Sequence, residues 1–100
     1  MLQNFKGGLT ENYVFNQLIT NRLSLYYWTS GSQAEVDFIT RLGNDIIPIE
    51  VKAKINNRSR SLGVYVDRFK PTYSIRISQK NFGFENNIKS VPLYAVFCIE

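Results

Sequence analysis

The chain has 100 residues, of which 44% are hydrophobic and 14% aromatic; it has no histidine and a single cysteine, Cys98. This length supports one hydrophobic core, so we expect a single domain over residues 1–100. The lack of histidine excludes Ser-His and Cys-His catalytic pairs, and one cysteine excludes an internal disulfide and a cysteine zinc site. No apolar run is long enough to span a membrane, and we therefore expect a cytoplasmic protein without a membrane partner.

The net charge of +4 is unevenly distributed along the chain. Residues 52–80 contain eight basic side chains and one acid, Asp67, so this segment carries +7 while the rest of the chain carries −3. Clustered positive charge attracts phosphate groups, which makes a nucleic acid a candidate partner. A solvated helix face with flanking loops is an equally good interpretation of the same charges.

The order of predicted elements indicates the fold class. Apolar residues at helical spacing predict helices over residues 9–20 and 59–69. β-Branched and aromatic residues predict strands over residues 23–30, 34–42, 45–53 and 72–78. The polar residues 79–90 predict a loop, and residues 92–99 suit either a short helix opened by Pro92 or a strand. The resulting order α-β-β-β-α-β predicts a mixed α/β domain with helices packed on a small sheet.

A hairpin between the second and third predicted strands brings two acids together. Gly43 and Asn44 predict a two-residue turn, because glycine accepts the positive φ of a type II′ turn. In the register that this turn sets, Asp37 faces Glu50 on the neighbouring strand. Side chains alternate between the two faces of a strand, so Lys52 shares the face of Glu50.

Two carboxylates in direct opposition destabilise a sheet, so we expect a compensating positive charge. One candidate is a hard divalent cation such as Mg²⁺ or Mn²⁺, which prefers oxygen ligands. The other is neutralisation by Lys52 and nearby arginines on an exposed face. Replacing Asp37 or Glu50 by alanine is expected to leave the fold intact or slightly stabilised, because each change removes a like-charge contact.

The spacing of Asp37, Glu50 and Lys52 resembles the D-(x)n-(D/E)-x-K signature of the PD-(D/E)xK phosphodiesterase superfamily, which has the restriction-endonuclease-like fold. The predicted element order resembles the α-β-β-β-α-β core of that fold. Glu11, in the first predicted helix, resembles the additional acid of the Holliday-junction-resolvase-like branch. The proline that gives the motif its name is absent here, as in many branches of the superfamily, and Val36 precedes Asp37 instead.

A second and more specific resemblance extends over residues 6–99. The chain is similar to the C-terminal domain of unknown function of prokaryotic AAA-type ATPases, a domain placed among nuclease-like folds. The similarity lies in the stretches KGGLTENYVFNQL, LYYWTSGSQAEVDFI, IIPIEVKA, SLGVYVDRFKPTYSIRIS and VPLYAVFCI. This resemblance implies a C-terminal fragment of a larger protein whose ATPase part would bind ATP. Consistently, the chain contains no G-x-x-x-x-G-K-[ST] phosphate-binding loop.

The superfamily resemblance implies a Mg²⁺-dependent or Mn²⁺-dependent nuclease that acts on DNA. Asp37 and Glu50 would hold the metal, with the backbone carbonyl of Val51 as a third ligand. Lys52 would orient the attacking water or stabilise the developing negative charge. Glu11 would complete the acidic cluster, directly or through a water.

DNA contacts are expected from the basic segment. Lys54, Arg58 and Arg60 would bind phosphates without reading the base sequence. Arg76 either lies at the edge of the site or pairs with an acid. Enzymes of this fold that cut both strands commonly act as dimers, so a homodimer is a further expectation.

Two non-catalytic functions fit the same sequence. The first is an inactive nuclease-fold module that binds nucleic acid or a protein partner for the ATPase. The second is a structural domain that supports ATPase oligomerisation through exposed apolar residues, for which residues 92–99 are the best candidates. Metal binding separates the nuclease from the inactive module.

Overall fold

The computed structural model describes residues 9–31, 34–52 and 60–99. The first half of the chain forms α1 (Leu9–Thr20), β1 (Tyr26–Ser30), β2 (Ala34–Leu42) and β3 (Asp45–Val51). The second half forms α2 (Arg60–Phe69), β4 (Ser74–Ser78), β5 (Gly83–Glu85), β6 (Ile88–Pro92) and the 3-10 helix η2 (Leu93–Cys98). No helix among these residues is long and apolar enough to cross a membrane.

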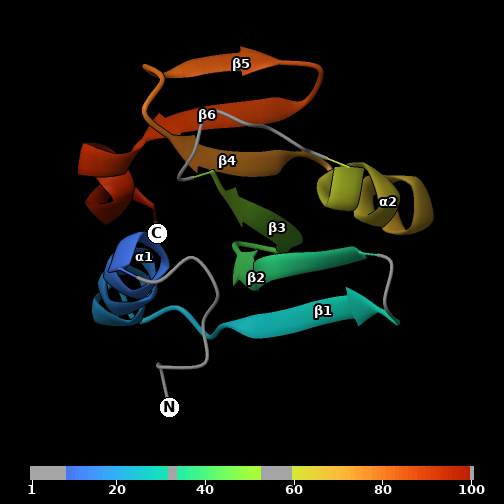
Figure 1. Cartoon of the computed structure of the whole chain (residues 1–100), viewed down its shortest axis with the longest axis horizontal. Coiled ribbons are helices and arrows are strands. Elements are labelled where there is room, and N and C mark those ends of the chain that lie inside the picture. The colour runs from blue at the N-terminus through green and yellow to red at the C-terminus, as the bar shows by residue number, and fades with distance from the viewer. Residues whose placement is uncertain (1–8, 32–33, 53–59, 100) are drawn as a thin grey trace.

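The strands form one mixed sheet in the order β1-β2-β3-β4-β6-β5, which Figure 1 shows from bottom to top. β1, β2 and β3 are antiparallel neighbours, whereas β3, β4 and β6 run parallel and β5 is antiparallel to β6. The chain passes through α2 between β3 and β4, because parallel neighbours need a crossover connection. The predicted mixed α/β class is confirmed, and β3 and β4 are the two central strands.

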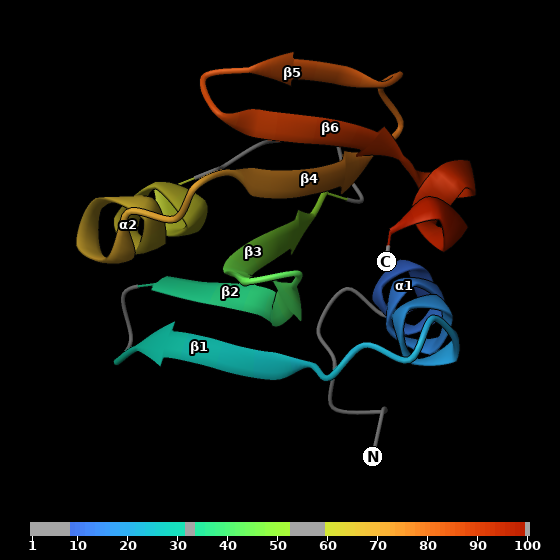
Figure 2. The same ribbon diagram turned by 180° about the vertical axis from the view of Figure 1, so that it is seen from behind.

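Helices pack on both faces of this sheet. The larger apolar cluster joins α1 and η2 to the sheet through buried residues that include Val14, Leu18, Phe38, Ile49 and Val96. The smaller cluster joins α2 to β1 and β2 through Trp28, Val36, Ile39 and Tyr65. Successive strand residues point to opposite faces, and Phe38 and Ile39 belong to different clusters, so α1 and α2 cover different faces. Figures 1 and 2 show α1 beside η2 at one end of the sheet and α2 at the other.

The predicted hairpin between β2 and β3 is confirmed. Gly43 has a φ of 65°, the positive value that a type II′ turn needs at this position. The paired positions extend from Leu42 with Asp45 to Phe38 with Ile49, in the predicted register. The local sequence therefore determined this part of the fold.

The prediction of a loop over residues 79–90 is wrong, because β5 and part of β6 lie within this segment. Asn86 and Asn87 connect the two strands and have φ values of 55° and 60°. Positive φ at both central residues is typical of a type I′ hairpin turn, and asparagine tolerates this conformation better than most residues. β5 is exposed along its whole length, and the buried residues of β6, Val91 and Pro92, lie beyond residue 90, so the segment predicted as a loop lacks the buried apolar alternation by which strands are recognised.

The remaining boundaries differ modestly from the predictions. β1 and β4 each begin later than predicted, at Tyr26 and Ser74. Of the two forms considered for residues 92–99, the helical one is confirmed as η2, with Pro92 at its N-cap. The strand predicted over residues 45–53 ends at Val51 and does not include Lys52, whereas the predicted helix start at Ser59 lies outside the described residues.

Candidate active site

The candidate site lies at the C-terminal end of the central strand β3. Ile49 and Val51 are buried in the core formed with α1, at 0% and 8% exposure. Alternation along the strand therefore directs Glu50 to the opposite face, as the sequence predicted. Lys52 follows directly after the strand and is half-buried.

Asp37 lies at an irregular point of β2. Trp28 of β1 pairs with Val36, but Tyr26 pairs with Ile39, so three steps on β2 match two steps on β1. An extra residue of this kind is a β-bulge, which bends the strand and redirects the side chains around it. Simple alternation therefore does not fix the direction of Asp37.

The carboxylate of Asp37 reaches β3 through a backbone hydrogen bond. The Val51 N–H donates to Asp37 Oδ2 at a distance of 3.2 Å. Glu50 and Lys52 flank Val51 in the chain, so the structure brings Asp37 to the Glu50-Val51-Lys52 segment. Asp37 thus contacts the backbone of the segment that contains Glu50 and Lys52.

Glu50 has a partner on the neighbouring strand. Glu50 and Arg76 are paired positions of the parallel strands β3 and β4, and Arg76 Nε donates to Glu50 Oε1 at 2.8 Å. Their side chains are 12% and 23% exposed, respectively. Of the two roles considered for Arg76, pairing with an acid is therefore present in the structure, and this pairing places Arg76 directly beside the site.

Lys52 interacts electrostatically with three charged residues. Burial lowers the pKa of Lys52 below its usual value of 10.5, and the positive charges of Arg76 and Lys80 lower this pKa further. The negative charge of Glu50 acts in the opposite direction and raises the pKa of Lys52. Lys52 thus lies within electrostatic reach of two other cations, and clustered positive charge attracts phosphate groups.

The first turn of α1 approaches the same end of β3. A small cleft here is lined by Thr10, Lys52, Ile77, Ser78, Gln79 and Leu93. Glu11 follows Thr10 in the chain, but its part in the site stays a prediction. Within the described ranges, no group of three or more His, Cys, Asp or Glu side chains is placed to hold a metal ion. A cation held by Asp37 and Glu50 would therefore need ligands from elsewhere.

Most of the expected DNA contacts cannot be located. Lys54 and Arg58 lie outside the described residues, and Arg60 is described only as the first residue of α2. Arg76 is the member of this set that the structure places at the site. Lys80 joins it there, although among the basic residues of the 52–80 segment it was not singled out for DNA binding.

Tyr27 is a neighbour of the site that the sequence did not indicate. Its hydroxyl donates a hydrogen bond to Glu35, and this bond is the largest cause that raises the pKa of Tyr27. Burial and the negative charges of Glu35 and Asp37 raise the same pKa further. The pairing of β1 with β2 depends on a bulge and not on a two-residue turn, so no local signal placed Tyr27 here.

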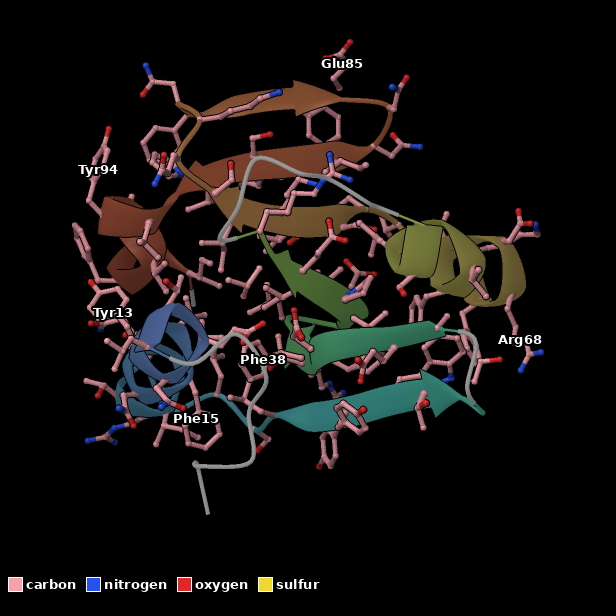
Figure 3. All side chains as sticks on the ribbon, viewed as in Figure 1. Tyr13, Phe15, Phe38, Arg68, Glu85 and Tyr94 are labelled. Atoms are coloured by element: carbon pink, nitrogen blue, oxygen red, sulfur yellow. The ribbon has the colours of Figure 1, made fainter. Side chains whose placement is uncertain are left out.

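An apolar groove adjoins the small cleft at the candidate site and shares Gln79 and Leu93 with it. It has a volume of about 440 Å³ and is lined by Tyr13, Gln79, Pro92, Leu93 and Tyr94. Tyr94 is 68% exposed, and Figure 3 shows Tyr13 and Tyr94 on the same edge of the molecule. An oligomerisation role for residues 92–99 stays a hypothesis.

Fold and site together define a small mixed α/β domain in which Asp37 contacts the backbone beside Glu50 and Lys52 at the end of a central strand. Residues 6–96 match the family model described as "Domain of unknown function (DUF4143)", and the chain belongs to this family. No curated protein and no solved structure matches the chain. The resemblance to a domain of unknown function is confirmed at this level.

Proposed function

We propose that this domain is a Mg²⁺-dependent phosphodiesterase that acts on DNA, with Asp37 and Glu50 as metal ligands and Lys52 as a catalytic residue. The hydrogen bond from the Val51 N–H to Asp37 Oδ2 carries this proposal, because it draws the Asp37 carboxylate to the segment that contains Glu50 and Lys52. Two carboxylates and an amine at one strand end are the groups that the PD-(D/E)xK signature requires.

The residues present fit Mg²⁺ in one specific way. Mg²⁺ retains several waters and is commonly bound through one or two carboxylates together with substrate phosphates. Asp37 and Glu50 supply two carboxylates, and no third acidic ligand is gathered among the described residues. The DNA phosphate would therefore supply a remaining ligand, so the site favours metal binding together with the substrate. The carbonyl of Val51 is a further candidate ligand.

Each protein group has a task in this proposal. A bound Mg²⁺ lowers the pKa of its water and neutralises charge on the phosphate. Lys52 places a positive charge where negative charge develops, and its half-buried position keeps that charge poorly screened by solvent. Asp37 is held in place by the Val51 N–H and thus enters the reaction with its carboxylate already oriented.

The wider assignment rests on the resemblances and on the basic segment. The order α1-β1-β2-β3-α2-β4 agrees with a restriction-endonuclease-like core, to which β5, β6 and η2 are additions. The charge of +7 over residues 52–80 suits binding to a DNA backbone. We further propose that the domain works in the cytoplasm as the C-terminal part of an AAA-type ATPase, and as a homodimer when both strands are cut.

One observation favours a second function, that of an inactive module which binds nucleic acid. In the structure, Glu50 already has a positive partner in Arg76, and Asp37 already accepts a backbone hydrogen bond. These contacts stabilise both carboxylates without a metal ion. In this alternative, Lys52, Arg76 and Lys80 would still bind phosphates, but metal would have no effect.

The test is cleavage of labelled single-stranded, double-stranded and branched DNA with Mg²⁺ or Mn²⁺. We expect metal-dependent cleavage by the wild type and its loss in Asp37→Asn, Glu50→Gln and Lys52→Ala. Glu85→Gln is a matched control for the loss of one acid, because Glu85 is exposed on β5 (Figure 3). DNA binding that ignores metal, with no cleavage of any substrate, would support the inactive module instead.

A further inference from the structure

We propose that Arg76 couples metal binding to DNA binding: without DNA it occupies Glu50, and a DNA phosphate draws it away and leaves Glu50 available to the metal. This inference rests on the proposed function and deepens it. It gives Arg76 the role of a positioning residue that acts through Glu50.

The starting state is the ion pair seen in the structure. Arg76 Nε and Glu50 Oε1 are 2.8 Å apart, on paired positions of neighbouring strands. A guanidinium remains charged at any ordinary pH, so titration does not release this pair. A metal ion that approaches the Glu50 carboxylate therefore meets a fixed positive charge already in contact with it. Repulsion between the two cations weakens metal binding in the DNA-free protein.

The surroundings of Arg76 offer a second place for its side chain. The cross-strand row that contains Glu50 and Arg76 continues to Ser90 on β6 and Gly83 on β5. Ser90 is half-buried and polar, and a Cβ built at the exposed Gly83 would have no atom within 4 Å. Ser90 and Gly83 thus place small side groups in the row that leads from Arg76 to the edge of the sheet. A phosphate group could approach Arg76 from there.

The chemistry of arginine suits the exchange of partners. Its planar guanidinium carries several N–H donors in a rigid fork, a geometry that matches phosphate as well as carboxylate. The Arg76 side chain is 23% exposed and therefore within reach of a ligand on the surface. Lys52 and Lys80 add positive charge nearby, so a phosphate drawn to this cluster arrives beside Arg76. Once Arg76 binds the phosphate, Glu50 loses its partner and needs a new cation.

The test compares calorimetric titrations of Mg²⁺ and Mn²⁺ into the wild type and Arg76→Gln, each without DNA and with a short DNA whose phosphorothioate linkages resist cleavage. In the wild type, we expect DNA to raise metal affinity about tenfold, within the usual range of coupling between two sites. In Arg76→Gln, metal affinity without DNA should rise about fivefold, and the further rise with DNA, which then comes only from the phosphate ligand, should be smaller than in the wild type. Arg68→Gln is the matched control, because Arg68 is exposed at the far end of α2 (Figure 3).

A second variant, which keeps the positive charge, shows whether the effect of Arg76→Gln comes from the lost side chain and not from a loss of folding. Arg76→Lys retains a cation beside Glu50 but lacks the planar fork, so we expect weak metal binding without DNA, as in the wild type, and a smaller effect of DNA. Metal binding by the wild type that Arg76→Gln does not change, with or without DNA, would overturn the coupling and leave the proposed function standing. Absence of metal binding in every protein, with DNA present as well, would overturn both.

Discussion

Arg76 Nε donates a hydrogen bond to Glu50 Oε1 at 2.8 Å, across the parallel strands β4 and β3. This contact and the hydrogen bond from the Val51 N–H to Asp37 each stabilise one of the two carboxylates. They therefore offset the repulsion expected between two acids of one hairpin. The fold supplies its own compensation for both acids. A metal ion is therefore not needed to hold the sheet together.

Substitution of Glu50 should destabilise the protein, contrary to the expectation from like-charge repulsion alone. Glu50→Gln leaves Arg76 half-buried without its charged partner, and we expect the free energy of unfolding to fall by about 1–2 kcal/mol. Urea unfolding at pH 7 measures this change. Glu85→Gln, on an exposed strand, should shift the free energy by less than about 0.5 kcal/mol. A Glu50→Gln protein more stable than the wild type would show that repulsion dominates after all.

Asp37 has a structural role that two variants can separate from its charge. Asp37→Ala removes the acceptor of the Val51 N–H, and we expect a loss of about 1–2 kcal/mol in the free energy of unfolding. Asp37→Asn keeps a side-chain oxygen that can accept the same hydrogen bond, so it should cost less. Thermal unfolding without metal gives both values. Equal losses in the two variants would mean that charge, and not the hydrogen bond, stabilises this position.

The lowered pKa of Lys52 predicts how the free energy of unfolding changes with pH. Because burial lowers this pKa in the folded protein, the unfolded state binds the proton more tightly. The charged amine therefore reduces stability at neutral pH, and this penalty disappears as the pH rises through the folded pKa toward 10.5. Lys52→Met should be more stable than the wild type at pH 7, and the two unfolding curves should converge in alkali. A constant difference across this pH range would contradict the shift.

The centre of the sheet should be the most sensitive part of the fold. Ile77 of β4 is completely buried in the core that α1 and η2 cover, so Ile77→Ala should lower the free energy of unfolding by about 2–5 kcal/mol. Ile46 provides a matched control, since it is an isoleucine of β3 that is 53% exposed. Ile46→Ala should cost much less in the same urea titration. Similar losses at the two positions would contradict the packing described here.

The sequence predicted the parts of the fold that short-range chemistry determines. Gly43 and Asn44 specify a turn, and the turn specifies a register that the structure follows as far as Phe38 and Ile49. The helix over residues 9–20 was predicted with its observed ends. In each case the signal lies within a few residues of the feature.

The ion pair between Glu50 and Arg76 could not be predicted from such a short-range signal. Glu50 meets Arg76 because β3 and β4 pair in parallel after a crossover through α2. No turn residue specifies the register of this pairing. The bulge near Asp37 is a second example, because it depends on how β1 pairs with β2. The hairpin of β5 and β6 was missed for another reason: Asn86 and Asn87 specify its turn, but β5 is exposed and β6 is buried only at Val91 and Pro92.

The most direct test of the account is a calorimetric titration of Mn²⁺ into the protein bound to uncleavable DNA. We predict saturable metal binding by the wild type, by Lys52→Ala and by Glu85→Gln, and its loss in Asp37→Ala and Glu50→Gln. This result would establish the two carboxylates as metal ligands and separate them from Lys52, for which we propose a role on the reacting groups. Binding of equal strength in Glu50→Gln and the wild type, or no binding by the wild-type complex, would contradict the assignment.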